Sequence, residues 1–213
     1  MNAKPALIAD DLLAAAATCC AALEPVLDRD WEVRAGDLEW SCRRTLDHIA
    51  DALLLYTTHL ATRATARRPP PRNGDPSASP AELLSAVESI AATNAEVIRA
   101  APPGTRAFHP AGMADTAGFI GMGCEEILVH TWDIAGGLGV PFAPSADLAA
   151  RIVARIFPWA PADVPPWDAL RWGAGRIALP GHDRLGPDWY WHCAPLEEWD
   201  GTIRKRTAPP AWR

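Results

Sequence analysis

Apolar residues recur at intervals of three or four positions over four long stretches of this 213-residue chain. That interval places them on one face of an α-helix, because residues three and four apart lie above one another along the helix. A chain with several such faces must pack them against one another to remove them from water. The pattern predicts four long helices at about 6–27, 41–63, 79–101 and 115–137, and a shorter fifth helix at 145–157.

Start signals support two of these helices. Ser41 and Ser79 are suitable N-caps, because a serine hydroxyl accepts a hydrogen bond from a backbone N–H of the first turn. Glu82 completes a capping box with Ser79, and Pro80 fits the first helical position. The third predicted helix therefore has the best-defined start in the chain.

The connection between the second and third predicted helices is long and rich in proline. It reads ARRPPPRNGDPSASP over residues 66–80, and its prolines remove backbone donors and fix φ, so no helix can continue through it. Four long helices favour a four-helix bundle, and the predicted fold class is all-α. Short loops would give a simple up-down order. This long connection instead permits a crossover that leaves the second and third helices side by side in the same direction.

The last quarter of the chain differs in composition. Residues 158–213 hold seven of the ten tryptophans and many prolines. Two short strands are expected there, Arg176–Leu179 and Asp188–Cys193, on either side of a Pro-Gly loop. The predicted organisation is a helical bundle over 1–157 and a small C-terminal extension over 158–213 that carries a β-ribbon.

Charge and hydropathy exclude two classes of partner. The formal net charge is −6 and no lysine- and arginine-rich face is present, so no nucleic-acid partner is expected. No run of 18 or more uncharged apolar residues suggests a membrane span, and the first residues lack the apolar core of a secretory signal. The five cysteines form no C-x-x-C pair and are interpreted as reduced thiols. We expect a cytoplasmic protein, monomeric or homodimeric.

The fourth predicted helix carries two polar residues on an otherwise apolar face. Glu126 and His130 lie one turn apart, with about 5–6 Å between their Cβ atoms. A carboxylate on an inward face is costly unless it is paired, hydrogen-bonded or bound to a metal. Two interpretations follow: a satisfied Glu–His pair, or part of a metal site. The apolar residues of the same face are Phe119, Met122 and Ile134.

A third donor is available on the second predicted helix. His48 lies among apolar residues, which is also the usual setting of a core histidine without a ligand. Two imidazoles and one carboxylate form a common three-ligand set for a divalent ion and leave a position for water or substrate. His59 is a weaker candidate, because it lies roughly 16 Å from His48 along the helix axis. Glu125 is also weaker, because it lies off the face that carries His130.

Three motifs carry a resemblance to a known family. They are W-S-x-x-x-x-L-D-H-I-A-D over 40–51, E-x-x-x-H-T-W-D-I-A over 126–135, and R-I-A-L-P-G followed by W-x-W-H over 176–192. Together they resemble the DinB-like four-helix bundle superfamily, and within it the mycothiol-dependent maleylpyruvate isomerase and mycothiol transferase group. The resemblance covers most of the chain. This chain has a short tail where the isomerase has a full C-terminal domain.

The resemblance implies a fold, a metal site and a chemistry. The fold is an up-down-down-up bundle, and the metal ligands are His48, Glu126 and His130. The expected metal is Zn²⁺, which would activate the thiol of a low-molecular-weight cofactor such as mycothiol for attack on a small electrophile. The outcome would be transfer of a group to the thiol or isomerisation by reversible addition.

Further candidates lie near these ligands. Asp51 and Asp133 each follow a proposed histidine ligand by three residues, and a ligand histidine usually donates its second N–H to such a group. His109, in the segment before the fourth helix, could line the pocket. Three tail residues could close over the site as a flap, or only pack against the bundle: Trp189, Trp191 and His192.

Two other function classes remain open from the sequence. The same two histidines and carboxylate also suit non-haem Fe(II), or hydrolysis by zinc-bound hydroxide. A binding protein of the DinB-like type without catalytic activity is the second class. The sequence does not indicate the identity of the electrophile.

Overall fold

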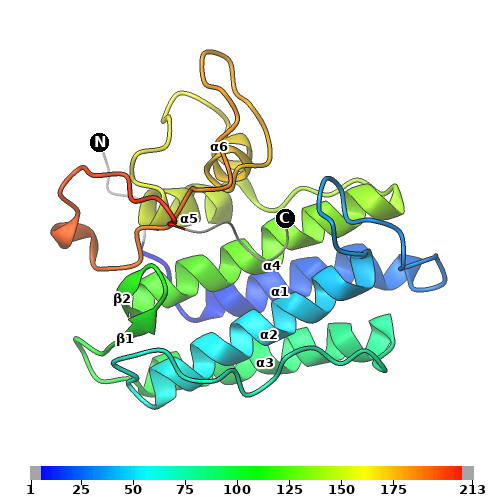
Figure 1. The fold of residues 1–213 in the computed structure, drawn as a ribbon, viewed down its shortest axis with the longest axis horizontal. Coiled ribbons are helices and arrows are strands. Elements are labelled where there is room, and N and C mark those ends of the chain that lie inside the picture. The colour runs from blue at the N-terminus through cyan, green and yellow to red at the C-terminus, as the bar shows by residue number, and fades with distance from the viewer. Residues whose placement is uncertain (1–5, 208–213) are drawn as a thin grey trace.

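The computed structural model describes residues 6–207 and is mostly helical, as the predicted all-α class requires (Figure 1). Four long helices occupy the first two thirds of the chain, close to their predicted positions. Their bounds are α1 (Asp10–Leu23), α2 (Cys42–Ala61), α3 (Pro80–Ala100) and α4 (Thr116–Leu138). None of the described helices is long and apolar enough to cross a membrane.

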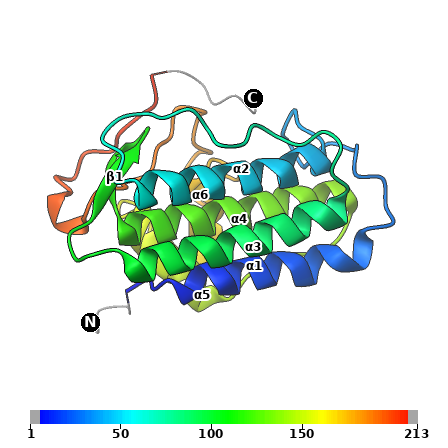
Figure 2. The same cartoon turned by 90° about the horizontal axis from the view of Figure 1, so that it is seen from below.

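The four long helices pack side by side (Figures 1 and 2). Apolar residues from all four of them form one buried core. Helix α2 contacts α3 and α4, and α1 also contacts both α3 and α4. The connection 62–79 runs back along α2 before α3 begins, so α2 and α3 point the same way (Figure 2). The proline-rich connection therefore acts as the crossover that the sequence permits.

The predicted helix starts are confirmed at two positions. The Ser41 hydroxyl accepts a hydrogen bond from the Arg44 backbone N–H at 3.1 Å and begins α2. A full capping box begins α3: Ser79 Oγ accepts from the Glu82 N–H at 3.3 Å, and Glu82 Oε2 accepts from the Ser79 N–H at 2.8 Å. Local chemistry alone decides these starts.

The prediction that the fourth helix ends at Gly136–Gly137 is wrong. Helix α4 continues to Leu138, and Gly139 ends it with φ of +69°, in the left-handed region that favours glycine. Gly137 is there for close packing, since a Cβ on it would lie 2.2 Å from the Arg34 carbonyl oxygen. The first helix also begins later than expected, at Asp10, and a 3-10 turn, η1 (Glu24–Val26), follows it.

A short hairpin that the sequence did not predict precedes α4. Strand β1 (Arg106–His109) pairs antiparallel with β2 (Gly112–Asp115). Asp115 then caps α4, with its Oδ1 accepting from the Gly118 N–H at 2.7 Å. Strands of four residues are too short to show a clear alternation of apolar and polar side chains, so this segment resembles a loop in the sequence.

The C-terminal part contains one predicted and one unpredicted helix. Helix α5 (Ala146–Ile156) matches the predicted fifth helix, and α6 (Pro166–Gly173) was not expected. A last 3-10 turn is η2 (Leu196–Glu198). Helix α5 packs on α4 and on α6, and both short helices lie on one side of the four long helices (Figure 1).

The prediction of a C-terminal β-ribbon is wrong for the described residues. Segments 176–179 and 188–193 do not pair with each other; Leu179 forms a single bridge with His182, and Trp189 forms one with Lys205. Both segments dock on helices instead. The Arg176 side chain is directed into the bundle, and the His192 backbone N–H donates to Ile156 O at the end of α5. The boundary at residue 157 between the helical bundle and the C-terminal extension stays a prediction. The last residues of that extension, 208–213, lie outside the described part of the chain.

Candidate metal centre

The structure brings together the three side chains that the sequence proposed as metal ligands. His48 comes from α2, and Glu126 and His130 come from α4. Glu126 Oε2 lies 3.5 Å from His48 Nε2 and 3.3 Å from His130 Nε2. One donor atom from each residue lies within 4.8 Å of the other two. The imidazole of residue 48 therefore points inward, towards the fourth helix.

The donor set fits a divalent cation. In a tetrahedral site with metal–ligand bonds of about 2.0–2.1 Å, neighbouring ligand atoms lie about 3.3 Å apart. The two Glu–His separations are close to this value. Glu126 and His130 are buried, whereas the His48 side chain keeps 18% of its surface accessible. The cluster is thus closed towards the core and open on the side of His48.

A buried ion pair orients His130. Its Nδ1 lies 3.0 Å from Asp133 Oδ2, and Arg176 Nη2 donates to the same oxygen at 2.8 Å. With the Nδ1 proton directed at Asp133, Nε2 is directed at Glu126 and the cluster. Burial disfavours the charged imidazolium, but the hydrogen bonds to Asp133 and Glu126 outweigh it and raise the pKa of His130 to about 9.

Glu126 is held in place by a tyrosine. Tyr56 on α2 donates its hydroxyl to Glu126 Oε1 at 3.0 Å, which leaves Oε2 directed at the two histidines. Burial acts to raise the pKa of Glu126, but His130 and His48 hold it well below the usual range. Trp40 packs against His48, with 4.9 Å between the ring centroids. Each of the three donors is thus positioned by a neighbouring side chain.

Asp51 and His109, which the sequence also predicted near the ligands, have other partners. Asp51 forms an ion pair with Arg72 and accepts a hydrogen bond from the Gly74 N–H at 3.1 Å, so it fastens the 62–79 connection to α2. His109 is buried beside Tyr56, with 5.2 Å between the ring centroids. Burial lowers the pKa of His109 to about 3. His109 is therefore a neutral residue at the edge of the cluster.

The two weaker candidates lie outside the cluster. His59 Nδ1 lies 2.8 Å from Phe108 O, and its Nε2 accepts from the Arg68 N–H, so it joins α2 to the hairpin and the connection. Glu125 is buried although it lies off the predicted inward face. The reason is that α4 is central: α1, α2 and α5 all pack against it. Burial and the charge of Glu126 raise the pKa of Glu125 to about 8.

A pocket of about 350 Å³ opens above the cluster. His48 and Glu126 line it, together with Tyr56 and His109. Side chains from α2 and the segment before it, the 62–79 connection, the hairpin turn and the tail complete its walls: Trp40, Arg44, Asp51, Ala52, Leu55, Arg67, Pro70, Arg72, Asn73, Pro110, Tyr190, Trp191 and Arg206.

The three tail residues predicted as a flap over the site have different surroundings. Trp191 lines the pocket and packs on His109, with 5.4 Å between the ring centroids. Trp189 instead packs on Phe157 at the end of α5, with ring centroids 5.9 Å apart. His192 Nε2 lies 3.0 Å from Pro195 O, within the tail itself. One of the three residues thus covers the site.

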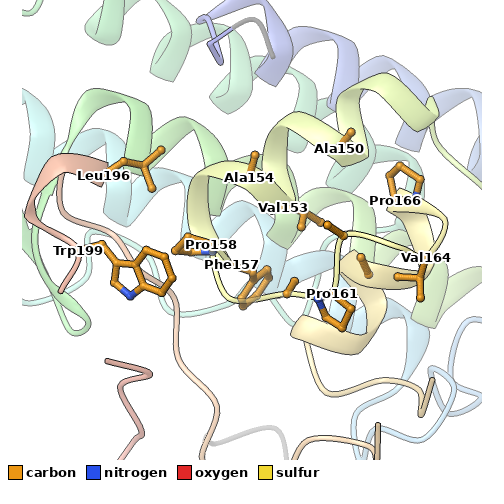
Figure 3. Close-up of a pocket in the computed structure, with 13 residues that line it drawn as sticks. Ala150, Val153, Ala154, Phe157, Pro158, Pro161, Val164, Pro166, Leu196 and Trp199 are labelled. Atoms are coloured by element: carbon orange, nitrogen blue, oxygen red, sulfur yellow. The ribbon is translucent and has the colours of Figure 1, made fainter. Parts of the chain in front are cut away.

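A second cavity, of about 440 Å³, lies between α5, α6 and the tail (Figure 3). None of the proposed ligands lines it. Its walls are apolar and include Val153, Phe157, Pro161, Leu196 and Trp199.

The five cysteines are all buried. Burial raises the pKa of Cys19 to about 12 and that of Cys42 and Cys193 to about 11. A thiol with such a pKa stays protonated near neutral pH, and the protonated form is a poor nucleophile.

Sequence reasoning missed three residues around the site. They are Tyr56, Arg176, which the sequence places only at the start of an expected strand, and Arg206. Tyr56 could have been found, because it lies eight positions after His48 on the same helix face. The two arginines give no such signal, because the tail reaches the site only through tertiary packing.

Comparison with known proteins gives one match. A family model described as the DinB superfamily matches residues 12–134, more than half of the chain, and this span contains all three donors. No curated protein and no solved structure matches.

Proposed function

The chain belongs to the DinB superfamily, and from this premise we propose that it is a metal-dependent enzyme acting on a low-molecular-weight thiol and a small electrophile. The reaction class is thiol transfer or thiol-assisted isomerisation, with Zn²⁺ as the metal and mycothiol as a representative thiol. The four long helices form its up-down-down-up bundle, and the described part of the predicted extension, residues 158–207, packs on it.

One observation carries the proposal. Two of the three donors, His48 and Glu126, line an open pocket, and the third, His130, is buried next to Glu126. A purely structural Glu–His pair needs no approach from solvent, whereas a catalytic metal keeps one position for water or substrate. The cavity of about 350 Å³ is large enough for a small reactant beside His48.

His48, Glu126 and His130 would hold the metal. When bound, a divalent cation supplies positive charge that favours the thiolate form of a thiol placed at its open position. Asp133 and Arg176 keep the His130 ring in one orientation and one tautomer. Tyr56 fixes the Glu126 carboxylate. The protein thus offers a preformed set of donors that needs little rearrangement.

The aromatic residues of the pocket serve a different purpose. Trp40, Tyr190 and Trp191 line the walls around the open side. They reduce the water around a bound reactant, which strengthens electrostatic interactions there and limits hydrolysis of a reactive electrophile.

The thiol of the reaction comes from outside the protein. Every cysteine is buried, and none of them lines the pocket above the cluster. Their raised pKa values keep them protonated near neutral pH. A soluble thiol is therefore the nucleophile that this site can use.

The test has two readouts. Protein purified without added metal is analysed for zinc and iron, and Zn²⁺-loaded protein is then assayed for thiol consumption with mycothiol and other cofactor thiols against epoxides, quinones and activated alkenes. We expect about one zinc per chain and consumption that Glu126→Gln abolishes. Consumption at the Glu126→Gln level for every pair would refute the transferase proposal.

The same assay separates the alternatives. Turnover of an ester or amide panel without any thiol would instead identify a hydrolase. Iron in place of zinc would point to non-haem iron chemistry. An intact protein that binds zinc but turns over neither panel would be a non-catalytic binding protein.

A further inference from the structure

Part of the wall of the pocket at the candidate metal centre is a length of chain without regular structure. Residues 64–72 of the 62–79 connection, here called the strap, run back along α2 (Figure 2). Three residues of the strap line the pocket: Arg67, Pro70 and Arg72. The position of the strap therefore helps to decide how wide the pocket opens.

Both ends of the strap are fastened to the rest of the protein. At its first end, Ala64 O accepts a hydrogen bond from the Phe108 N–H of β1 at 2.7 Å. At its last end, Arg72 forms ion pairs with Asp47 and Asp51 of α2. Neither attachment involves a histidine, which is the side chain that ordinarily changes its charge near neutral pH.

The middle of the strap is held by a histidine. His59, near the end of α2, is buried, and its Nε2 accepts a hydrogen bond from the Arg68 N–H at 3.4 Å. Among the described residues, this is the one hydrogen bond that residues 65–71 make. Residues 69–71 are prolines and have no N–H to donate. The bond at Arg68 therefore fixes the middle of the strap on α2.

The two contacts of the His59 ring define its protonation state. A carbonyl oxygen only accepts a hydrogen bond, so Nδ1, which lies 2.8 Å from Phe108 O, carries a proton. A backbone N–H only donates, so Nε2, which faces the Arg68 N–H, carries none. The contacts require the neutral imidazole, because an imidazolium would direct an N–H at the Arg68 N–H.

The segments around His59 contribute positive charge or none. Arg67 and Arg68 lie on the strap, and Arg63 follows the end of α2. The titratable neighbour on the hairpin is His109, on which a charge at His59 would act. Burial lowers the pKa of His109 to about 3, so it stays neutral near neutral pH.

The carboxylates at this end of the molecule have other partners. The histidines that form ion pairs within the described residues are His48 and His130. Glu96, near the end of α3, pairs with Arg99. A buried charge without a counter-charge is costly. Protonation of His59 therefore acts against the fastened strap.

We propose that His59 is a pH-dependent latch: when its ring is protonated, the strap leaves α2 and the pocket at the candidate metal centre opens wider. An ordinary histidine changes its charge between about pH 5 and pH 8. Because the fastened strap needs the neutral ring, it is favoured at the upper end of this range and is lost towards the lower end. An effect on turnover rests on the proposed function, whereas the release of the strap does not.

Hydrogen exchange of the full-length protein, followed by NMR, tests the latch. The Arg68 amide reports the bond to His59, and its protection factor corrects for the intrinsic effect of pH on exchange. From about pH 8 to about pH 5 we expect this factor to fall about tenfold or more, with the midpoint of the His59 ring titration. The Gly74 amide, which donates to Asp51 Oδ1 at 3.1 Å, is an internal reference and should keep its protection.

Two variants control this result. His59→Gln replaces the ring with a side chain that is neutral at every pH, so the pH dependence of Arg68 protection should disappear. His182→Gln removes an exposed histidine outside the pocket and should leave that dependence unchanged. Each measurement is repeated on metal-free protein, because histidine ligands also release a metal in acid.

Several outcomes would overturn the proposal. An Arg68 protection factor that stays constant while His59 titrates is one, and an equal fall in His59→Gln, at Gly74 or only in metal-loaded protein is another. The ring nitrogens give a measurement that needs no variant: a proton on Nε2 at about pH 8, or a ring still neutral at about pH 5, would also end it. No reactant is used, so failure of the latch leaves the zinc analysis and the thiol assay of the proposed function unaffected.

Discussion

Two cavities of this protein, one apolar and one polar, differ in chemistry more than in size. The apolar one, of about 440 Å³, lies between α5, α6 and the tail (Figure 3). The polar one, of about 350 Å³, combines two carboxylates, two histidines, four arginines and an aromatic wall. Volume does not mark either cavity as the functional site, whereas the reactive side chains mark the second.

The origin of the walls explains this difference. The apolar cavity is built from residues 150–169 and two residues of one short tail turn. The pocket at the candidate metal centre takes its walls from α2, α4, the 62–79 connection, the hairpin turn and the tail. Burying so many polar groups is costly, and each must be satisfied by a partner. The Tyr56–Glu126 and His130–Asp133–Arg176 contacts meet that requirement.

The largest predicted effect tests whether the polar cavity holds the metal. Glu126→Gln and His48→Ala should each weaken zinc binding by more than 100-fold, which exceeds the 10–100-fold typical of losing an outer partner of a ligand. Competition with a chromophoric chelator measures the affinity. His182→Ala, a histidine outside both cavities, is the control and should bind zinc like the unaltered protein. Unchanged affinity in His48→Ala would show that the ligand assignment is wrong.

The second prediction tests whether any cysteine of the protein itself could act as the nucleophile. At pH 8 the cysteines of the folded protein should react with Ellman's reagent about 100-fold more slowly than those of the urea-unfolded protein. Burial raises their pKa values to about 11 or more at three positions, so little thiolate is present and access is blocked. One rapidly reacting cysteine in the folded protein would contradict the expectation that the thiol comes from outside.

The third prediction concerns the support of the metal centre. Asp133→Asn should weaken zinc binding about 10–100-fold, because His130 loses the acceptor that sets its tautomer. It should also lower the free energy of unfolding by about 3–5 kcal/mol, because buried Arg176 loses its carboxylate. Urea unfolding measures the second effect.

Asp168→Asn is the matched control for this change. Asp168 pairs with Arg171 near the surface, and such pairs contribute about 0–1 kcal/mol. If the two substitutions weakened zinc binding equally, Asp133 would have no specific role in supporting the metal centre.

The smallest predicted effect belongs to the apolar cavity. Ala154 lies exposed on its wall, and Ala154→Glu should change the free energy of unfolding by no more than about 0.5 kcal/mol. Zinc content and thiol consumption should be unchanged. A loss of activity in this variant would show that the two cavities are coupled, and the contrast between them would fail.

Local signals explain why much of the fold was predictable. Ser41 and the Ser79–Glu82 capping box begin two helices through contacts within a few residues, so no distant partner is needed. The hairpin at 106–115 and helix α6 were missed because short elements carry too few residues to establish a period. The expected β-ribbon failed because its two segments found better partners on helices than on each other.

The sequence by itself determined the helices, their inward faces and the three donors at the centre of the candidate site, because helical periodicity and residue chemistry are local properties. Tertiary structure alone decided which side chains support those donors. Arg176 reaches Asp133, and Arg206 reaches the pocket, only because the tail folds back over α4 and the hairpin. Contacts between residues far apart in the chain depend on packing against the whole core, and no local sequence pattern predicts them.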